Sequence, residues 1–96
     1  MGYQFKTTFW SDFSIADIFG EDAVKDTYKR AFKEWKDDTV YVTELSLVLN
    51  WKCWQHYERG NESLSKLYSD LYYELDAWCL DHLKGDDLVY YWKTLD

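Results

Sequence analysis

The chain contains no proline and only four glycines among its 96 residues. Proline ends helices, and glycine supplies many of the turns between short strands, so their scarcity removes the usual punctuation of an all-β protein. Long stretches of the chain are free to form helices. These absences favour an all-α fold.

A long apolar run is also missing. No segment approaches the roughly 18 to 20 uninterrupted apolar residues that a membrane span requires. The stretch MGYQFKTTFWSD lacks a basic region followed by an apolar one, so no secretory signal is expected. The sequence therefore predicts a cytoplasmic protein without a membrane segment, in which both cysteines stay reduced.

Basic residues are scarce in the C-terminal part. Residues 58–96 hold nine acids and four bases, and the whole chain carries a net charge of −7. A protein that binds nucleic-acid phosphates needs clustered lysine and arginine. Direct nucleic-acid binding is therefore not expected, and a partner protein with a basic surface suits the charge better.

Apolar and aromatic side chains are abundant, at 47% and 21% of the residues. A chain of this length fits one domain with its own core, so we expect a single helical domain over residues 1–96. Apolar side chains recur at helical spacing in five segments. The expected helices are 12–19, 21–37, 39–59, 62–84 and 88–95. The predicted fold is an all-α, compact four- to five-helix bundle.

Local signals set these boundaries. Ser11 or Asp12 can cap the first helix, and Asn61 can cap the fourth, which Gly85 should end. The third helix is apolar nearly all round, which is typical of a helix in the middle of a bundle. Residues 3–9 alternate aromatic and polar side chains without a second strand to pair with. We expect a short extended N-terminal arm or an edge strand there.

The strings TTFWSDFSIADIFG, DAVKDTYKRAFKEWKDD, LNWKCWQHYERGN and LKGDDLVYYWKTLD cover most of the chain. In these strings the chain resembles a family of small acidic proteins carried on conjugative elements and phages of gut bacteria. The resemblance brings no catalytic residue, cofactor or substrate. It implies a mobile-element protein that inhibits a host defence or assists transfer.

The cysteines and histidines form a repeated pattern, Cys53-x-x-His56 and Cys79-x-x-His82. Each pair shares one helix face and has the ligand types of half a zinc site. In an antiparallel hairpin that turns at Gly60, however, the two halves lie about 17 Å apart, given the helical rise of about 1.5 Å per residue. Neither a metal site nor a disulfide between the two cysteines is expected.

Catalysis has little support. Cys79 should be buried among apolar neighbours, where a thiol is unreactive, and His82 continues an apolar stripe as a half-buried core histidine. The sequence has no glycine-rich phosphate loop and no nucleophile elbow. We expect neither an enzyme nor a cofactor.

The aromatic residues exceed what a small core can hide. Four tyrosines are candidates for partner binding: Tyr57, Tyr73, Tyr90 and Tyr91. Tyrosine is enriched at binding hot spots, although large amphipathic rings also simply cover small bundles. Tyr91 is at the same time expected to help the last helix close the bundle.

A line of acidic residues on the fourth helix is the second candidate surface. Asp70, Glu74 and Asp81 share one side of the helix, and Asp86 and Asp87 follow beyond it. The line could imitate the phosphates of a nucleic acid, or it is an ordinary solvated face. The sequence thus predicts a non-enzymatic protein-interaction module of a mobile element, with inhibition of a host defence factor as one form. The alternative is a structural or self-associating accessory protein that forms a homo-oligomer.

Overall fold

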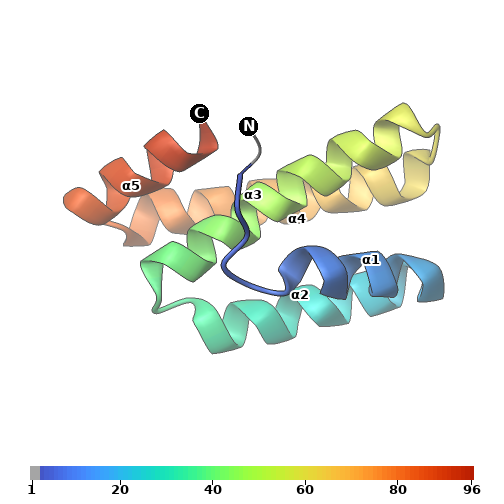
Figure 1. Ribbon diagram of the computed structural model, residues 1–96, viewed down its shortest axis with the longest axis horizontal. Coiled ribbons are helices and arrows are strands. Elements are labelled where there is room, and N and C mark those ends of the chain that lie inside the picture. Colours follow the sequence, from blue (N-terminus) through green and yellow to red (C-terminus); the bar gives the residue numbers. More distant parts are fainter. Residues whose placement is uncertain (1–2) are drawn as a thin grey trace.

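The computed structural model describes residues 3–96 and shows an all-α protein (Figure 1). Its helices are α1 (Phe9–Phe19), α2 (Glu21–Trp35), α3 (Thr39–Glu58), α4 (Glu62–His82) and α5 (Asp86–Leu95). Within residues 3–96 the structure is 82% helical and forms no strand. The predicted helical bundle is confirmed, with five helices in this part of the chain.

The first helix begins at Phe9, earlier than the expected cap at Ser11 or Asp12. Phe9 and Phe13 lie four residues apart, and both are buried in the core. An added turn of helix places both rings on the same inward face. The Thr8 hydroxyl donates to the Asp12 carboxylate, so it does not cap a backbone group.

The fourth helix ends at His82 rather than at Gly85. Leu83 leaves the helix in an extended conformation and is buried, so the chain turns inward to place this leucine in the core. At the opposite end of α4 the prediction is correct, since the Asn61 side chain accepts a hydrogen bond from the backbone N–H of Leu64. Gly60, at φ +76°, supplies the left-handed residue of the turn between α3 and α4.

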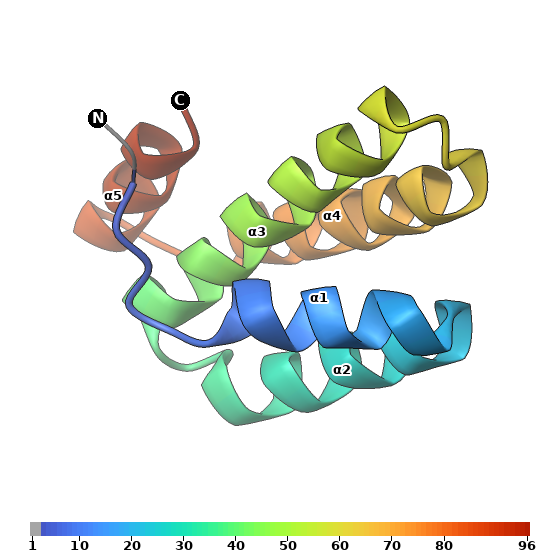
Figure 2. The same cartoon turned by 45° about the vertical axis from the view of Figure 1, so that its right-hand side comes forward.

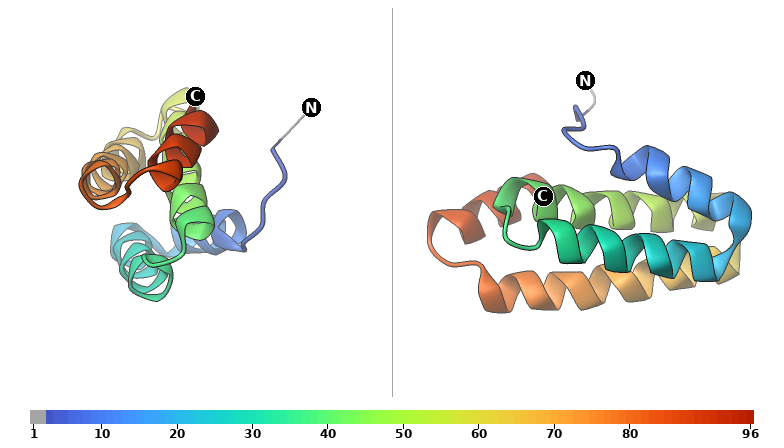
Figure 3. Two further views of the ribbon diagram at one scale, coloured as in Figure 1. Left: turned by 90° about the vertical axis from the view of Figure 1, so that its left-hand side faces the viewer. Right: turned by 90° about the horizontal axis from the view of Figure 1, so that it is seen from below.

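Helix α3 lies in the middle of the molecule, as its apolar pattern predicts. All eight residues from Val42 to Leu49 are buried. In the end-on view of Figure 3, α3 lies between α5 and the α1–α2 hairpin, and α4 packs along its length. Because neighbours surround it on three sides, the segment from Val42 to Leu49 has no solvent-exposed face.

The α1–α2 hairpin packs against α3 and α4 (Figures 1 and 2). Two contacts show that α2 and α4 run in the same direction. The Ser63 hydroxyl donates to Glu21 near the start of both helices, and the Phe32 and Trp78 rings meet edge to face at 5.0 Å near their ends. α5 crosses the first half of α3, where the Tyr91 hydroxyl lies 3.1 Å from that of Ser46. The same hydroxyl donates to Asp76 of α4 at 2.6 Å.

The N-terminal arm is held by Glu44 of α3. This carboxylate is fully buried and accepts the hydroxyl of Tyr3 and the backbone N–H of Lys6 and of Thr7, each at 2.8 Å, together with the Thr7 hydroxyl. Hydrogen-bond donors on the arm therefore satisfy a charge that would otherwise be costly to bury. The arm is present, but over residues 3–8 it pairs with no strand.

A search of residues 3–96 finds no helix with the length and apolar character needed to cross a membrane.

Candidate protein-interaction groove

A groove begins where α5 ends its contact with the α3–α4 hairpin. On α3, Ser46 lies 3.1 Å from the hydroxyl of Tyr91 of α5. Steps of three or four residues from Ser46 lead along the same side of α3 to Asn50, Trp54 and Tyr57. The side of α3 that α5 covers therefore continues beyond α5 to the far end of the helix.

Helix α4 shows the same continuation. Asp76 accepts the hydrogen bond of Tyr91, and steps of three or four residues lead from it to Tyr72, Ser69 and Ser65. In Figures 1 and 2, α5 lies over one end of the α3–α4 pair only. The seam between α3 and α4 is thus covered by α5 at one end and uncovered by any described helix at the other.

The uncovered part of the seam is a groove of about 370 Å³. It is lined by Asn50, Cys53, Trp54, Tyr57, Ser65, Ser69, Tyr72 and Tyr73. Small side chains form part of the lining, where the Ser65 hydroxyl donates to the carbonyl of Cys53 at 3.0 Å. Aromatic side chains from both helices stand beside them.

The aromatic lining is exposed to an unusual degree. Trp54 is 57% exposed, and Tyr57 and Tyr73 are each 66% exposed. Trp54 packs edge to face on Tyr57, and Tyr72 does the same with Tyr73, at centroid distances of 5.6 and 5.4 Å. Such pairs present large, ordered surfaces that carry both apolar area and hydrogen-bonding groups. This is the side-chain chemistry of binding hot spots.

The structure separates the four predicted tyrosines. Tyr57 and Tyr73 lie in the groove, although they come from different helices. Tyr90 is half-buried near Tyr3. Tyr91 was expected on the binding surface, and this is wrong, because it is fully buried and its hydroxyl joins α5 to α3 and α4. Its second predicted role, in closing the bundle, is the one observed.

Trp54 and Tyr72 were not identified as interface residues from the sequence, and they complete the two aromatic pairs. The spacing of residues in the sequence did contain a signal for them. Trp54 and Tyr57 are three residues apart, and Ser65, Ser69 and Tyr72 follow steps of four and three. The pairing of these two patterns across a seam depends on the register of α3 against α4, which no pattern within one helix reports.

The predicted acidic line lies on another side of α4. Asp70 follows Ser69 and is therefore turned from the groove by about 100°. It is exposed and pairs with Lys66 at 3.2 Å. Glu74 stands beside the Tyr28 hydroxyl of α2, whose pKa is raised by burial and then by this carboxylate. Asp70, Glu74 and the exposed Asp81 form a strip. Each of the three already has a neighbour within the protein, since Asp81 lies 3.6 Å from Nδ1 of His82.

Asp86 and Asp87 occupy the first turn of α5 and are exposed. A carboxylate there is stabilised by the positive end of the helix dipole. This local role accounts for both residues without a partner.

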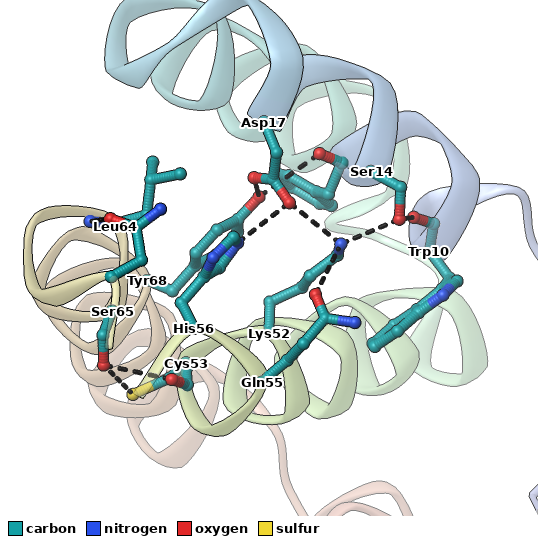
Figure 4. A network of polar contacts seen from close by, with 12 residues as sticks. Trp10, Ser14, Asp17, Lys52, Cys53, Gln55, His56, Leu64, Ser65 and Tyr68 are labelled. Atoms are coloured by element: carbon teal, nitrogen blue, oxygen red, sulfur yellow. Dashed lines mark hydrogen bonds and ion pairs between the residues drawn. The ribbon is translucent and has the colours of Figure 1, made fainter. Parts of the chain in front are cut away.

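A buried polar cluster joins α1 to α3 and α4 (Figure 4). The Asp17 carboxylate accepts hydrogen bonds from Lys52 Nζ and His56 Nε2, each at 2.9 Å, and from the Tyr68 hydroxyl. Lys52 is only 2% exposed and also donates to Ser14 at 2.7 Å. Burial, followed by the contact with Asp17, raises the pKa of Tyr68. These groups satisfy one another and do not line the α3–α4 groove, which is the pattern of a structural cluster.

The two thiols lie in different surroundings. Cys53 is beside Ser65 in the groove, whereas Cys79 is buried and has Ser46 and Tyr91 as hydrogen-bonding neighbours. Burial raises the pKa of Cys79 to about 11. Among residues 3–96, no group of three or more His, Cys, Asp or Glu side chains is placed to hold a metal ion.

His82 differs from its prediction. It was expected half-buried in the core, but its side chain is 51% exposed and stacks on Trp78. Its Nδ1 lies 2.9 Å from the carbonyl of Trp78 in the preceding turn. The stripe of α4 reaches solvent here because the helix ends at this residue.

No protein-family model, curated protein or solved structure matches the chain. The geometry and chemistry of the groove are therefore the evidence for a function.

Proposed function

We propose that this chain is a non-catalytic protein-interaction module whose groove between α3 and α4 receives a helix of a partner protein. The observation that carries the proposal is the continuity between the groove and the surface on which α5 docks. The same two helix faces that bind α5 run on, uncovered, past Trp54, Tyr57 and Tyr73. A helix placed end to end with α5 would extend an interface that the protein already uses.

The groove defines the chemistry of this partner. From Asn50 to Tyr57 it spans about 10 Å, or two helical turns. α5 docks with apolar residues spaced at three and four, Leu88, Tyr91 and Leu95. The partner helix carries a similar stripe, with polar groups that reach Asn50, Ser69 and the tyrosine hydroxyls. Glu58, Arg59 and Glu62 are exposed near the turn at the open end, where the two carboxylates outnumber the one cation and favour lysine or arginine beside the stripe.

The chemistry of the remaining groups supports a non-catalytic role. Cys79 is buried, and its raised pKa disfavours the thiolate that a nucleophile requires. The Asp17 carboxylate is occupied by Lys52 and His56. By its resemblance to mobile-element proteins, we further propose that the module acts in the cytoplasm on a host or element-encoded protein.

Photo-crosslinking tests the groove directly. Benzoylphenylalanine replaces Tyr73 in the groove or, as the control, Lys29 on the exposed side of α2. After irradiation in host lysate, the crosslinked peptide is sequenced by mass spectrometry. We expect the Tyr73 probe to capture one protein within a helix bearing an apolar stripe, and the Lys29 probe to capture none of it.

A second set of variants checks the same contact. Trp54→Ala and Tyr57→Ala should each weaken binding of the captured helix, made as a peptide, by about ten-fold or more. Crosslinks of the Tyr73 probe only to another copy of the chain, with a dimer in light scattering, would instead establish the self-associating accessory protein. Equal affinity of the two alanine variants and the wild type would exclude the groove.

A further inference from the structure

Helix α1 has an apolar face that the fold leaves uncovered. Its sequence, FWSDFSIADIF, is apolar on most sides, and Phe9, Phe13 and Ala16 face the core. On the outside, Ile15 is 57% exposed, Ile18 is 80% exposed and Phe19 is 77% exposed. A helix that is apolar all round normally has neighbours all round. Within residues 3–96, the structure leaves the side of α1 that carries Ile15, Ile18 and Phe19 largely uncovered.

This face borders a second groove, which has a volume of about 590 Å³ and lies between α1 and α2. Its lining includes small side chains at Ala16, Ala23, Thr27 and Ala31. Small residues on two adjacent helices allow a third helix to approach closely. Ile15, Phe19 and Trp35 supply larger apolar surfaces around them.

The charges of this groove select its occupant. Three carboxylates lie in its lining, those of Asp12, Asp26 and Glu34, against one cation, Arg30. The Arg30 guanidinium already pairs with Asp26 at 3.3 Å. Glu21 and Asp22 follow Phe19 and are both exposed. The lining of the groove therefore has an excess of acidic side chains, which favours lysine or arginine on the partner.

A second copy of the chain does not fit these charges. Two copies that met through this groove would bring Asp12, Asp26 and Glu34 of each chain together, and each chain carries a net charge of −7. Like charges across an interface oppose association. An anionic membrane surface is disfavoured for the same reason.

We infer that the α1–α2 groove is a second docking surface, which binds an amphipathic helix with an apolar stripe flanked by lysine or arginine. It is independent of the α3–α4 groove, because the two are lined by different helices. A protein with both surfaces can hold two helices at once and so bridge two partners or two segments of one partner. This activity goes beyond the single contact proposed above.

Selection from a peptide library provides the test. A phage-displayed library of helical peptides of about 16 residues, some four turns, is selected on the wild-type protein. The enriched peptides are synthesised and titrated against Ile15→Asp and Phe19→Asp variants, both at exposed positions. Val89→Asp is the matched control, since Val89 is an exposed apolar residue of α5. Trp54→Asp separates this surface from the α3–α4 groove.

We expect one class of enriched peptides to combine an apolar stripe with basic flanks. Their affinity should fall by about ten-fold or more in the Ile15 and Phe19 variants and remain unchanged in the Val89 and Trp54 variants. Their affinity should also weaken as salt is raised. Circular dichroism and thermal melting of each variant establish that it is folded.

Three results would overturn the inference. The first is a selection in which every enriched peptide binds the Phe19→Asp variant as tightly as the wild type, or in which no peptide is enriched. The second is a preference for acidic flanks at this groove. The third is a wild-type dimer in sedimentation that Phe19→Asp dissociates, which would make the occupant a second copy.

Discussion

Single buried charges govern how the helices of this protein hold together. Asp17 lies on α1 and binds Lys52 and His56 of α3 and Tyr68 of α4. Glu44 plays the same role for the N-terminal arm. In both cases a carboxylate with little or no exposure, 13% for the Asp17 side chain and none for Glu44, collects donors from segments far apart in the sequence. A mistake in packing would leave the charge without donors, so these residues select one arrangement of the segments.

Asp17→Asn is the sharpest test of this role. The change leaves Lys52, which is 2% exposed, without its anionic partner. Breaking a buried ion pair in this way costs about 3 to 5 kcal/mol of folding free energy. Urea unfolding of the variant measures the loss.

Asp70→Asn is the matched control, because it removes an exposed carboxylate that pairs with Lys66. Exposed pairs contribute about 0 to 1 kcal/mol, so its unfolding curve should nearly overlay that of the wild type. Equal effects of the two substitutions would show that the Asp17 cluster is not a stabilising contact.

The two cysteines should react at very different rates. Cys79 is fully buried, and burial raises its pKa to about 11, so the folded protein offers almost no accessible thiolate there at neutral pH. Cys53 is half-buried at the groove. With a chromogenic disulfide reagent we expect one thiol to react in the native state and the second only after unfolding. Labelling of Cys79 in native Cys53→Ser protein would contradict this.

At the scale of elements, α5 depends on one side chain. The Tyr91 hydroxyl contacts Asp76 of α4 and Ser46 of α3, and Tyr91 is fully buried. Tyr91→Phe keeps the ring but leaves the buried Ser46 and the half-buried Asp76 without this partner. Such a loss costs about 1 to 3 kcal/mol.

Hydrogen exchange shows which helix loses protection when this free energy is lost. We expect the amides of α5 to exchange faster in Tyr91→Phe, whereas those of α1 and α2 keep their order of protection. Tyr90→Phe, at the neighbouring half-buried position, should change neither stability nor exchange appreciably. Faster exchange throughout the molecule would mean that α5 does not open separately.

The acidic strip of α4 and the α3–α4 groove are two candidate binding surfaces, and they lead to opposite predictions for partner binding. Asp70→Lys, Glu74→Lys and Asp81→Lys together reverse the strip but leave the groove residues intact. If the groove is the binding surface, the captured helix still binds with at most a few-fold change. Loss of binding by the folded triple variant would favour phosphate mimicry instead. Because Glu74 lies beside Tyr28, melting temperature is measured alongside.

At the scale of the whole molecule, three helices contribute buried tyrosines that link stability to alkaline pH. Burial raises the pKa of Tyr28, Tyr68 and Tyr91 in the folded state. Unfolded tyrosine loses its proton near pH 10, so above that pH the unfolded chain binds fewer protons than the native one. The contribution of these tyrosines to the free energy of unfolding is therefore fully present below about pH 10. It falls as pH rises further, by up to about 1.4 kcal/mol per pH unit for each tyrosine.

Urea unfolding between about pH 9 and pH 11.5 measures this slope. Tyr28→Phe removes one titrating group, and we expect the slope to decrease by the contribution of about one proton. A free energy of unfolding that stays constant across this range would contradict the assignment of these tyrosines as buried and neutral. The effect is global because the three residues lie on α2, α4 and α5.

The overall size agrees with a single folded unit over the described residues. Their radius of gyration is 12.8 Å, close to the roughly 12.5 Å expected for a compact chain of this length. Two grooves interrupt this unit, one on each helical hairpin. Both lie between paired helices, where the side chains of the two helices leave a seam that a third helix can fill.

The sequence by itself determined the helices and the centre of the bundle. Spacing at three and four follows from the geometry of one helix, so the apolar stripe of α4, the Asn61 cap and the central position of α3 could be predicted locally. The local sequence signal is weaker at the ends of the helices. α1 begins at Phe9 and α4 stops at His82 because Phe9 and Leu83 gain burial from partners elsewhere in the chain.

Only the tertiary structure decided which exposed side chains form surfaces. Tyr57 and Tyr73 were predicted, but their meeting across a seam depends on the register of α3 against α4. Tyr91 was misplaced because a tyrosine suits both a surface and a core that offers its hydroxyl two partners. Asp17, Lys52 and His56 carry no joint pattern in the sequence, since residues 35 to 39 positions apart become neighbours only through packing. Periodicity reports one helix at a time, whereas a groove or a buried cluster belongs to several.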